Sequence, residues 1–213
     1  LIGLRGKIRY FSFFVCSPSV HDIKIQRFLC FNLRFVSRWK SSLIDLRDSE
    51  SDIKKNMKYS WRRKINKKND NLDCYLTADN SQYEWIIDKY LRMKKERGFD
   101  GPSEKLLRFL IENKTLNDDY FLFVAKLENK NIAGILIAKH PPVATYLVAW
   151  VGDEGRKNNA NYALLWYAIR RLKEAGVKYL DMGGYNENSI GISQFKKGLN
   201  GKEYCLSGTY IFI

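Results

Sequence analysis

The sequence predicts a mixed α/β fold in which a mostly antiparallel sheet is flanked by helices. Three β-rich runs, separated by a short polar connection and by a proline pair, predict an antiparallel meander over residues 121–127, 132–139 and 144–151. An amphipathic segment follows at 161–175, and a short apolar run at 179–182 returns as another strand. Since such a sheet has apolar faces, the helices are expected to cover them.

The composition is that of a folded protein with one main domain. Hydrophobic residues make up 45% of the 213 residues and aromatic residues 14%, which excludes a disordered chain. The length suits one sizeable core. The four cysteines are widely separated and there are only two histidines, so the sequence predicts neither a disulfide framework nor a metal site.

The first 41 residues are expected to form a strand and a helix. The run from Tyr10 to Cys16 reads as the strand, although a basic start, a short apolar run and small residues are also typical of a secretory signal. We expect the strand rather than export, and therefore a cytoplasmic protein. Apolar residues from Ile23 to Val36 recur at three- and four-residue spacing, which predicts an amphipathic helix.

A strongly basic helix is predicted after a short strand at 42–46. Ser49 or Ser51 is expected to cap it, and one apolar stripe consists of residues four apart: Ile53, Met57, Trp61 and Ile65. Its other faces are crowded with lysine and arginine. Like charges at this spacing cost a few tenths of a kcal/mol for each pair. Either an anionic partner or a solvated helix surface explains why they are tolerated.

The middle of the chain predicts core elements without chemistry. A strand at 74–77 leads to a helix at 81–97 that Gly98 ends. Pro102 and Ser103 open a further helix, whose predicted inner residues are Leu106, Leu107, Leu110 and Ile111. At the far end of the chain, residues 206–213 are expected to close the sheet.

A ligand site is predicted within residues 178–200, KYLDMGGYNENSIGISQFKKGLN. Gly183 and Gly184 remove two side chains where the strand stops, so the backbone can approach a ligand closely. Ile190, Ile192 and Phe195 are expected to bury a short helical turn that aims Lys196 back toward the strand end, where open α/β sheets place ligands. The alternative is an ordinary turn with a solvated lysine pair.

The net charge of +14 favours anionic partners. These include tRNA, CoA, nucleotide-linked precursors and anionic lipid at the inner membrane surface, where peripheral contact is one expectation. Salt-dependent, nonspecific attraction to nucleic acid follows from the same charge, so weak RNA binding alone does not identify the function.

Several motifs together resemble a known family. They are SSLIDL, WRRKINK, FVAKLENKNIAGILIA, NYALLWYAIRRLKEAGVKYLDMGGYN and FKKGLNG. With the predicted order of strands and helices, these are similar to the Fem-type (FemAB-like) peptidoglycan bridge aminoacyltransferases and their acyl-CoA-using relatives, within the GCN5-related N-acyltransferase (GNAT) fold. The resemblance implies a GNAT-like N-acyltransferase domain at 42–213. Because Fem-type proteins usually carry two such units, residues 1–41 are expected to be the remnant of a preceding or completing unit.

The resemblance also implies a reaction and its residues. An acyl or aminoacyl group would pass from acyl-CoA or aminoacyl-tRNA to an amine of a cell-wall or surface-glycan precursor, with no tightly bound cofactor. A lysine at position 196 can stabilise the oxyanion that develops at the carbonyl. The catalytic candidates are Lys196, Asp181 and Glu154. Apart from the resemblance, Glu154, Asp181 and Tyr185 are the candidate proton acceptors, and the sequence does not rank them. The substrate-binding candidates are Phe195, Gly183, Gly184, Tyr185, Arg62, Arg63, Arg156 and Trp150.

One departure concerns the donor. Acetyl-CoA-binding members of the fold cradle pyrophosphate in a loop with the pattern R/Q-x-x-G-x-G/A, using backbone N–H groups and a helix N-terminus. The loop at 155–161 has no glycine after Arg156, so the CoA cradle is degenerate or absent. A noncatalytic RNA- or membrane-surface-binding module is the alternative function, with Tyr59 and Trp61 as candidate stacking residues, although Trp61 lies on the apolar stripe and is expected in the core.

Overall fold

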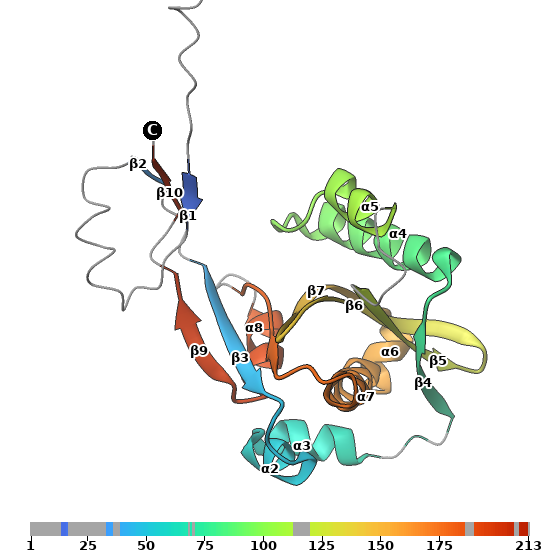
Figure 1. The fold of residues 1–213 in the computed structure, drawn as a ribbon. Helices are drawn as coiled ribbons and strands as arrows, with labels where there is room; N and C mark the ends of the chain where they lie inside the picture. The colour runs from blue at the N-terminus through green and yellow to red at the C-terminus, as the bar shows by residue number, and fades with distance from the viewer. Residues whose placement is uncertain are drawn as a thin grey trace, which may run out of the picture.

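The computed structural model describes residues 39–67, 69, 71–112, 120–185 and 190–206, together with the backbone of 14–16, 33–35 and 209–212. Its main body is a seven-stranded sheet in the order β4-β5-β6-β7-β8-β3-β9 (Figure 1). Only the β7–β8 pair is parallel among these strands. The predicted mixed α/β fold with a mostly antiparallel sheet is therefore confirmed.

The strands follow the predicted meander and extend it on both sides. Those of the main sheet are β3 (Lys40–Asp45), β4 (Leu72–Thr77), β5 (Tyr120–Leu127), β6 (Lys130–His140), β7 (Val143–Val151), β8 (Tyr179–Asp181) and β9 (Lys202–Cys205). Buried apolar residues on β5 and β6 form the centre of the core, since both faces of these strands are covered.

Helices cover both faces of this sheet. The elements are α2 (Glu50–Asn56), α3 (Tyr59–Asn66), α4 (Asn80–Arg97), α5 (Glu104–Glu112), α6 (Asp153–Lys157), α7 (Ala160–Glu174) and α8 (Ile190–Lys197). One hydrophobic cluster joins α4 and α5 to the sheet, and a second joins α2, α3 and α7 to the opposite face (Figure 1). Within the described residues, no helix combines the length and the apolarity needed to cross a bilayer.

The predicted basic helix is two helices. Ser49 caps α2 as expected, accepting a hydrogen bond from the amide of Asp52 at 3.1 Å. The helix then stops at Met57, whose backbone is extended. The next amide, of Lys58, donates at 2.9 Å to the carbonyl of Gly198, just past α8. This contact between distant segments replaces a helical hydrogen bond, although the stripe of Ile53, Met57 and Trp61 is buried as predicted.

The two ends of the chain pair with each other. β1 (Phe14–Cys16) agrees with the predicted strand, but β2 (Leu33–Phe35) is a strand where a helix was expected. The rest of these two predictions lies outside the described residues. β10 (Thr209–Phe212) pairs with both in a separate sheet of order β1-β10-β2. The prediction that 206–213 closes the main sheet is wrong, because β9 already pairs with the outer edge of β3.

The buried face of α5 also differs from its prediction. Leu107 and Ile111 are buried in α5, whereas Leu106 is 45% exposed. Residues 106, 107, 110 and 111 span more of a helix surface than this short helix buries against α4.

Trp61 is expected to anchor α3 to α8. Its side chain is 2% exposed, and its indole N–H donates at 2.8 Å to the carbonyl of Phe195. We expect Trp61→Phe to lower the free energy of unfolding by about 1–3 kcal/mol, because a partly buried carbonyl loses its donor. Urea denaturation measures this. Trp85→Phe is the control, because the Trp85 indole packs edge-on against Trp150 and makes no such hydrogen bond to any residue that the structure describes. Equal losses in the two variants would contradict the prediction.

Candidate active site

The strands β7 and β8 part at the centre of the sheet. They pair in parallel only over Val143–Thr145 and Tyr179–Asp181, and β7 then continues to Val151 without β8 beside it. Beyond Thr145, β6 is the only strand beside β7 in the described part of the sheet. Near this point the register of β7 against β6 also shifts, as at a bulge. Beyond Thr145, this edge of β7 therefore has no partner strand in the described sheet, and we call this place the opening between β7 and β8.

Two glycines form the turn at the end of β8, which we call the diglycine bend (Gly183–Gly184). Gly183 has φ of +65°, and a Cβ there would lie 2.5 Å from the carbonyl oxygen of Tyr146. At Gly184, a Cβ would lie 2.6 Å from the ring of Trp39. The bend therefore packs against β7 on one side and an indole on the other, which only glycine permits.

Lys196 lies beside this bend. Its side chain is 6% exposed, and its ammonium donates at 2.8 Å to the carbonyl oxygen of Gly184. The same nitrogen lies 5.2 Å from the centre of the Tyr146 ring. Burial lowers the pKa of Lys196 to about 8, and the negative charge of Asp181 opposes this shift. The site thus holds a desolvated ammonium where β7 and β8 separate.

The helix that carries Lys196 is held differently from the prediction. Ile190 and Ile192 were expected to be buried, but they are 66% and 39% exposed. Instead, Phe195 anchors α8. Its ring lies 5.2 Å from Trp61 and 5.1 Å from Tyr162, so it packs into the α3–α7 interface rather than toward the diglycine bend.

Asp181 is the centre of a hydrogen-bond network that the sequence did not reveal. Its Oδ1 accepts from the Ser41 hydroxyl at 2.5 Å and from the Gly183 amide at 2.8 Å. Its Oδ2 accepts from the Tyr204 hydroxyl at 2.5 Å. Burial and the carboxylate of Asp181 raise the pKa of Tyr204 to about 12, so this hydroxyl stays protonated.

Tyr185 follows the bend directly. Its amide donates at 3.1 Å to the carbonyl of Lys40 on β3, and the Lys197 ammonium lies 5.3 Å from its ring centre. Burial, reinforced by the negative charge of Glu203, raises the pKa of Tyr185 to about 12. At neutral pH the side chain is therefore a neutral phenol.

Three predicted site residues form contacts away from Lys196. Glu154 and Arg156 belong to α6, where Glu154 pairs with Lys130 at 2.9 Å and Arg156 with Asp153 at 2.5 Å. Figure 1 shows α6 and α8 on opposite sides of α7 in that view. Trp150 packs 5.6 Å from Trp85, against α4. The structure therefore groups Asp181, the diglycine bend and Lys196, and leaves these three outside the group.

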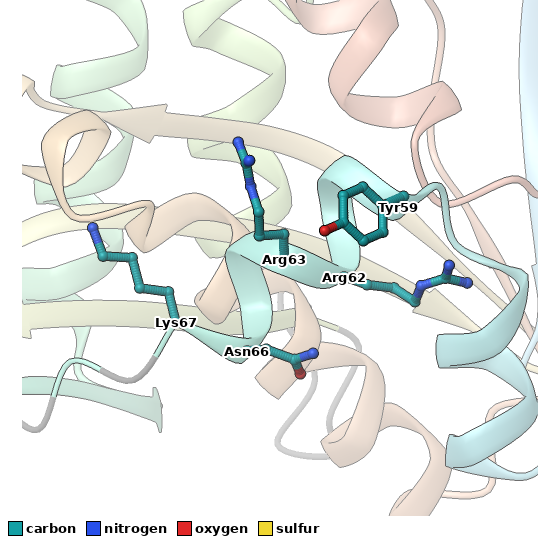
Figure 2. Close-up of a pocket in the computed structure, with 5 residues that line it drawn as sticks. All are labelled: Tyr59, Arg62, Arg63, Asn66 and Lys67. Carbon is teal, nitrogen blue, oxygen red and sulfur yellow. The ribbon is translucent and has the colours of Figure 1, made fainter.

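Arg62 and Arg63 belong to a basic surface on α2 and α3. It consists of Lys54, Lys55, Lys58, Arg62, Arg63, Lys64 and Lys67, which we call the α2–α3 basic surface. None of these side chains forms an ion pair with another described residue. A shallow hollow of about 390 Å³ lies among them, lined by Tyr59, Arg62, Arg63, Asn66 and Lys67. Figure 2 shows Arg63 and Lys67 projecting on one side of α3 and Arg62 pointing away from them.

The titration of Lys196 predicts a pH-dependent stability. Its pKa is about 8 in the folded protein, below the unfolded value of 10.5, so the unfolded chain binds more protons between these values. The contribution of Lys196 to the free energy of unfolding should therefore rise with pH from about 8 to about 10.5. Below pH 8 its burial is fully destabilising. Urea denaturation of the wild type and of Lys196→Met tests this. From pH 8 to pH 10.5, the free energy of unfolding of the wild type should rise relative to that of the variant. A constant difference between the two proteins would contradict the prediction.

A family model described as an acetyltransferase (GNAT) domain matches residues 53–197. No curated protein matches the sequence. The match therefore covers the meander, α7, the diglycine bend and Lys196, while β9 lies beyond it.

Solved structures share the fold at low sequence identity. The structure of FemX matches with a TM-score of 0.69 and 12% identity, covering 82% of this chain and 61% of that one. L-PGS from Bacillus licheniformis gives 0.54 and 14%, covering 93% and 67%. The C-terminal domain of a putative lysylphosphatidylglycerol synthetase from Agrobacterium fabrum gives 0.50 and 14%, covering 81% and 59%. The chain thus spans about three fifths of the length of FemX.

Proposed function

Because this chain belongs to the acetyltransferase (GNAT) domain family, we propose that it is an N-acyltransferase, which transfers an acyl or aminoacyl group to an amine of a cell-wall or surface-glycan precursor. Membership of an enzyme family favours this reading over the noncatalytic binding module. The observation that carries the proposal is the buried ammonium of Lys196, 2.8 Å from the Gly184 carbonyl at the opening between β7 and β8. The proposed catalytic domain is the predicted unit of residues 42–213, extended to the start of β3 at Lys40.

Lys196 acts as the oxyanion stabiliser in this proposal. The acceptor nitrogen attacks the donor carbonyl carbon, and negative charge develops on the carbonyl oxygen. A desolvated ammonium interacts with that charge more strongly than a solvated one does. The new C–N bond then replaces the C–O bond of an ester or the C–S bond of a thioester, and the proton from nitrogen passes to the leaving oxygen or sulfur. Direct transfer needs no covalent enzyme intermediate, so positioning supplies much of the remaining rate.

The exposed edge of β7 is proposed to hold the donor. Beyond Thr145, its backbone N–H and C=O groups on this edge face no strand of the described sheet, so they can pair with amide groups of an extended ligand, as an added strand would. This arrangement points the reactive end of the ligand toward the diglycine bend. Tyr185 is proposed to line the acceptor side of the same opening, as its place after the bend indicates.

Aminoacyl-tRNA is the donor that we favour over acyl-CoA. A diphosphate is usually cradled by backbone N–H groups ahead of a helix such as α7. Here α6 fills that position with Asp153 and Glu154 in its first turn. A Cβ at Gly155 would lie 2.5 Å from the carbonyl oxygen of Ile132, so this glycine packs on the sheet rather than opening a phosphate loop. The α2–α3 basic surface, including Arg62 and Arg63, is proposed to contact the carrier.

A transfer assay with two donor arms tests the proposal. The purified chain is incubated with a nucleotide-linked peptidoglycan precursor that bears a free amine, and with either aminoacyl-tRNA or acyl-CoA. We expect mass spectrometry to show the precursor heavier by one aminoacyl group in the tRNA arm. Transfer only from acyl-CoA would overturn the donor assignment and keep the acyltransferase site. Transfer from neither donor to any of a panel of amine acceptors would overturn the proposed reaction.

A further inference from the structure

We propose that Ser41 and Tyr204 are positioning residues, which hold Asp181 against the Gly183 amide and thereby fix the diglycine bend beneath Lys196. This inference rests on the proposed function of the Lys196 site. It gives two residues outside the sequence-predicted set a role in the reaction, and it changes the role of Asp181 from proton acceptor to structural anchor.

Three neighbouring strands bring these side chains to one face of the sheet. Ser41 on β3 lies directly opposite Tyr204 on β9, and Leu43 lies opposite Asp181 on β8. Residues two apart on a strand point to the same face, so Ser41 also faces the residues that follow Asp181. The contacts therefore follow from strand register, which makes them features of the sheet rather than of one mobile side chain.

Both oxygens of the Asp181 carboxylate already accept hydrogen bonds. Ser41 and the Gly183 amide share Oδ1, while Tyr204 occupies Oδ2, and both hydroxyl contacts are 2.5 Å long. Hydrogen bonds from hydroxyls to a carboxylate are short and strong compared with neutral ones. Two hydroxyls and one backbone amide therefore occupy this carboxylate, and they leave little room for an attacking amine to approach it.

The same bonds set the geometry at Lys196. Asp181 fixes the Gly183 amide, which lies in the left-handed turn, and the next carbonyl accepts from the Lys196 ammonium. Ser41 is completely buried, and its hydroxyl also lies 2.9 Å from the Gly183 carbonyl oxygen. The Gly183 amide is therefore tied to Asp181, and the single proton of the Ser41 hydroxyl lies within reach of both the Asp181 carboxylate and the Gly183 carbonyl. A shift of the bend would move the ammonium relative to the donor carbonyl.

The charged and titratable groups around the network are few in the described structure. Asp181 comes from β8, Lys196 from α8, Tyr204 from β9 and Tyr146 from β7, where burial raises the pKa of Tyr146. Beyond Tyr185, Lys197 and Glu203 pair with each other at 3.4 Å. Asp181 is thus the carboxylate nearest in this network to Lys196, and its charge favours the ammonium form.

Two measurements on Ser41→Ala and Tyr204→Phe test the inference. Hydrogen exchange of the Gly183 amide reports the bend without any substrate, and we expect it to be at least about tenfold faster in each variant. In the transfer assay, kcat should fall about tenfold while KM stays within about threefold, because the loss lies in positioning at the reacting carbonyl. The double variant should be little worse than the poorer single one, since both hydroxyls act through Asp181. Tyr75→Phe, on the far edge strand β4, is the matched control and should change neither readout.

The outcomes separate this inference from the proposed function. Unchanged amide exchange in both variants would overturn the positioning role, and so would faster exchange with kcat within about twofold of the wild type. A wild type that transfers nothing would overturn the proposed reaction. The contribution of Ser41 and Tyr204 to that reaction would then be overturned too, whatever the exchange data show.

Discussion

Replacing Lys196 by methionine is expected to lower kcat for acyl transfer by about 10²–10³-fold, which is the effect of removing one donor from an oxyanion site. The ammonium is the charged group that α8 delivers to the diglycine bend, and methionine keeps the length of the side chain without its charge. Steady-state transfer with saturating donor measures kcat. Lys197→Met is the matched control, because the neighbouring lysine is exposed and pairs with Glu203 on the surface. It should stay within about threefold of the wild type.

The stability of Lys196→Met shows whether its loss of activity comes from unfolding or from the reaction itself. Burying an ammonium is unfavourable, so Lys196→Met is expected to be at least as stable as the wild type at pH 7. Thermal unfolding of the two proteins checks this. A variant that is inactive and at least as stable supports a role in the reaction, whereas a variant that keeps wild-type kcat would contradict that role.

Gly183→Ala is expected to cause the second large loss, about 10²-fold in kcat, because displacement at a reacting centre by about 1 Å has effects of that size. The new Cβ would lie 2.5 Å from the Tyr146 carbonyl oxygen, so β7 or the bend must move. The positive φ adds a cost of about 1–2 kcal/mol to stability. Transfer kinetics and urea denaturation measure the two effects.

Gly176→Ala is the control that separates the stability cost of a positive φ from the effect of the Cβ contact with β7. Gly176 has φ of +75°, close to that of Gly183, but a Cβ there meets no atom within 4 Å. This variant should lose about 1 kcal/mol of stability from backbone strain and keep its kcat. If Gly176→Ala and Gly183→Ala lose stability and activity equally, the close approach of the bend to β7 has no role.

Local patterns in the sequence were sufficient to predict the meander and the long helices. The polar turn at 128–129 and the proline pair at 141–142 separate β5, β6 and β7 where expected, because turns depend on a few neighbouring residues. Gly98 and Gly176 end their helices with positive φ, as C-terminal glycines do. The strand, the two glycines and the lysine that follow also lie close together in sequence, which made Lys196 and the bend recognisable.

Contacts between distant segments account for what was missed. Ser41 and Tyr204 are 163 positions apart and meet only through the strand order β8-β3-β9, which no local pattern specifies. A buried serine pair at the start of a strand, SSLID, was the available signal. The break between α2 and α3 depends on the Gly198 carbonyl, and the exposure of Ile190 and Ile192 reflects anchoring of α8 by Phe195.

The pH dependence of the chemical step tests the role of Lys196 most directly. Single-turnover transfer rates are measured from pH 6 to 9.5 for the wild type and for Lys196→Met, with hydrolysis of the donor subtracted. The wild-type rate should fall as pH rises through about 8, because the ammonium loses the proton that stabilises the oxyanion. The Lys196→Met rate should show no fall there. A wild-type rate that keeps rising through this range, in parallel with the variant, would contradict the account.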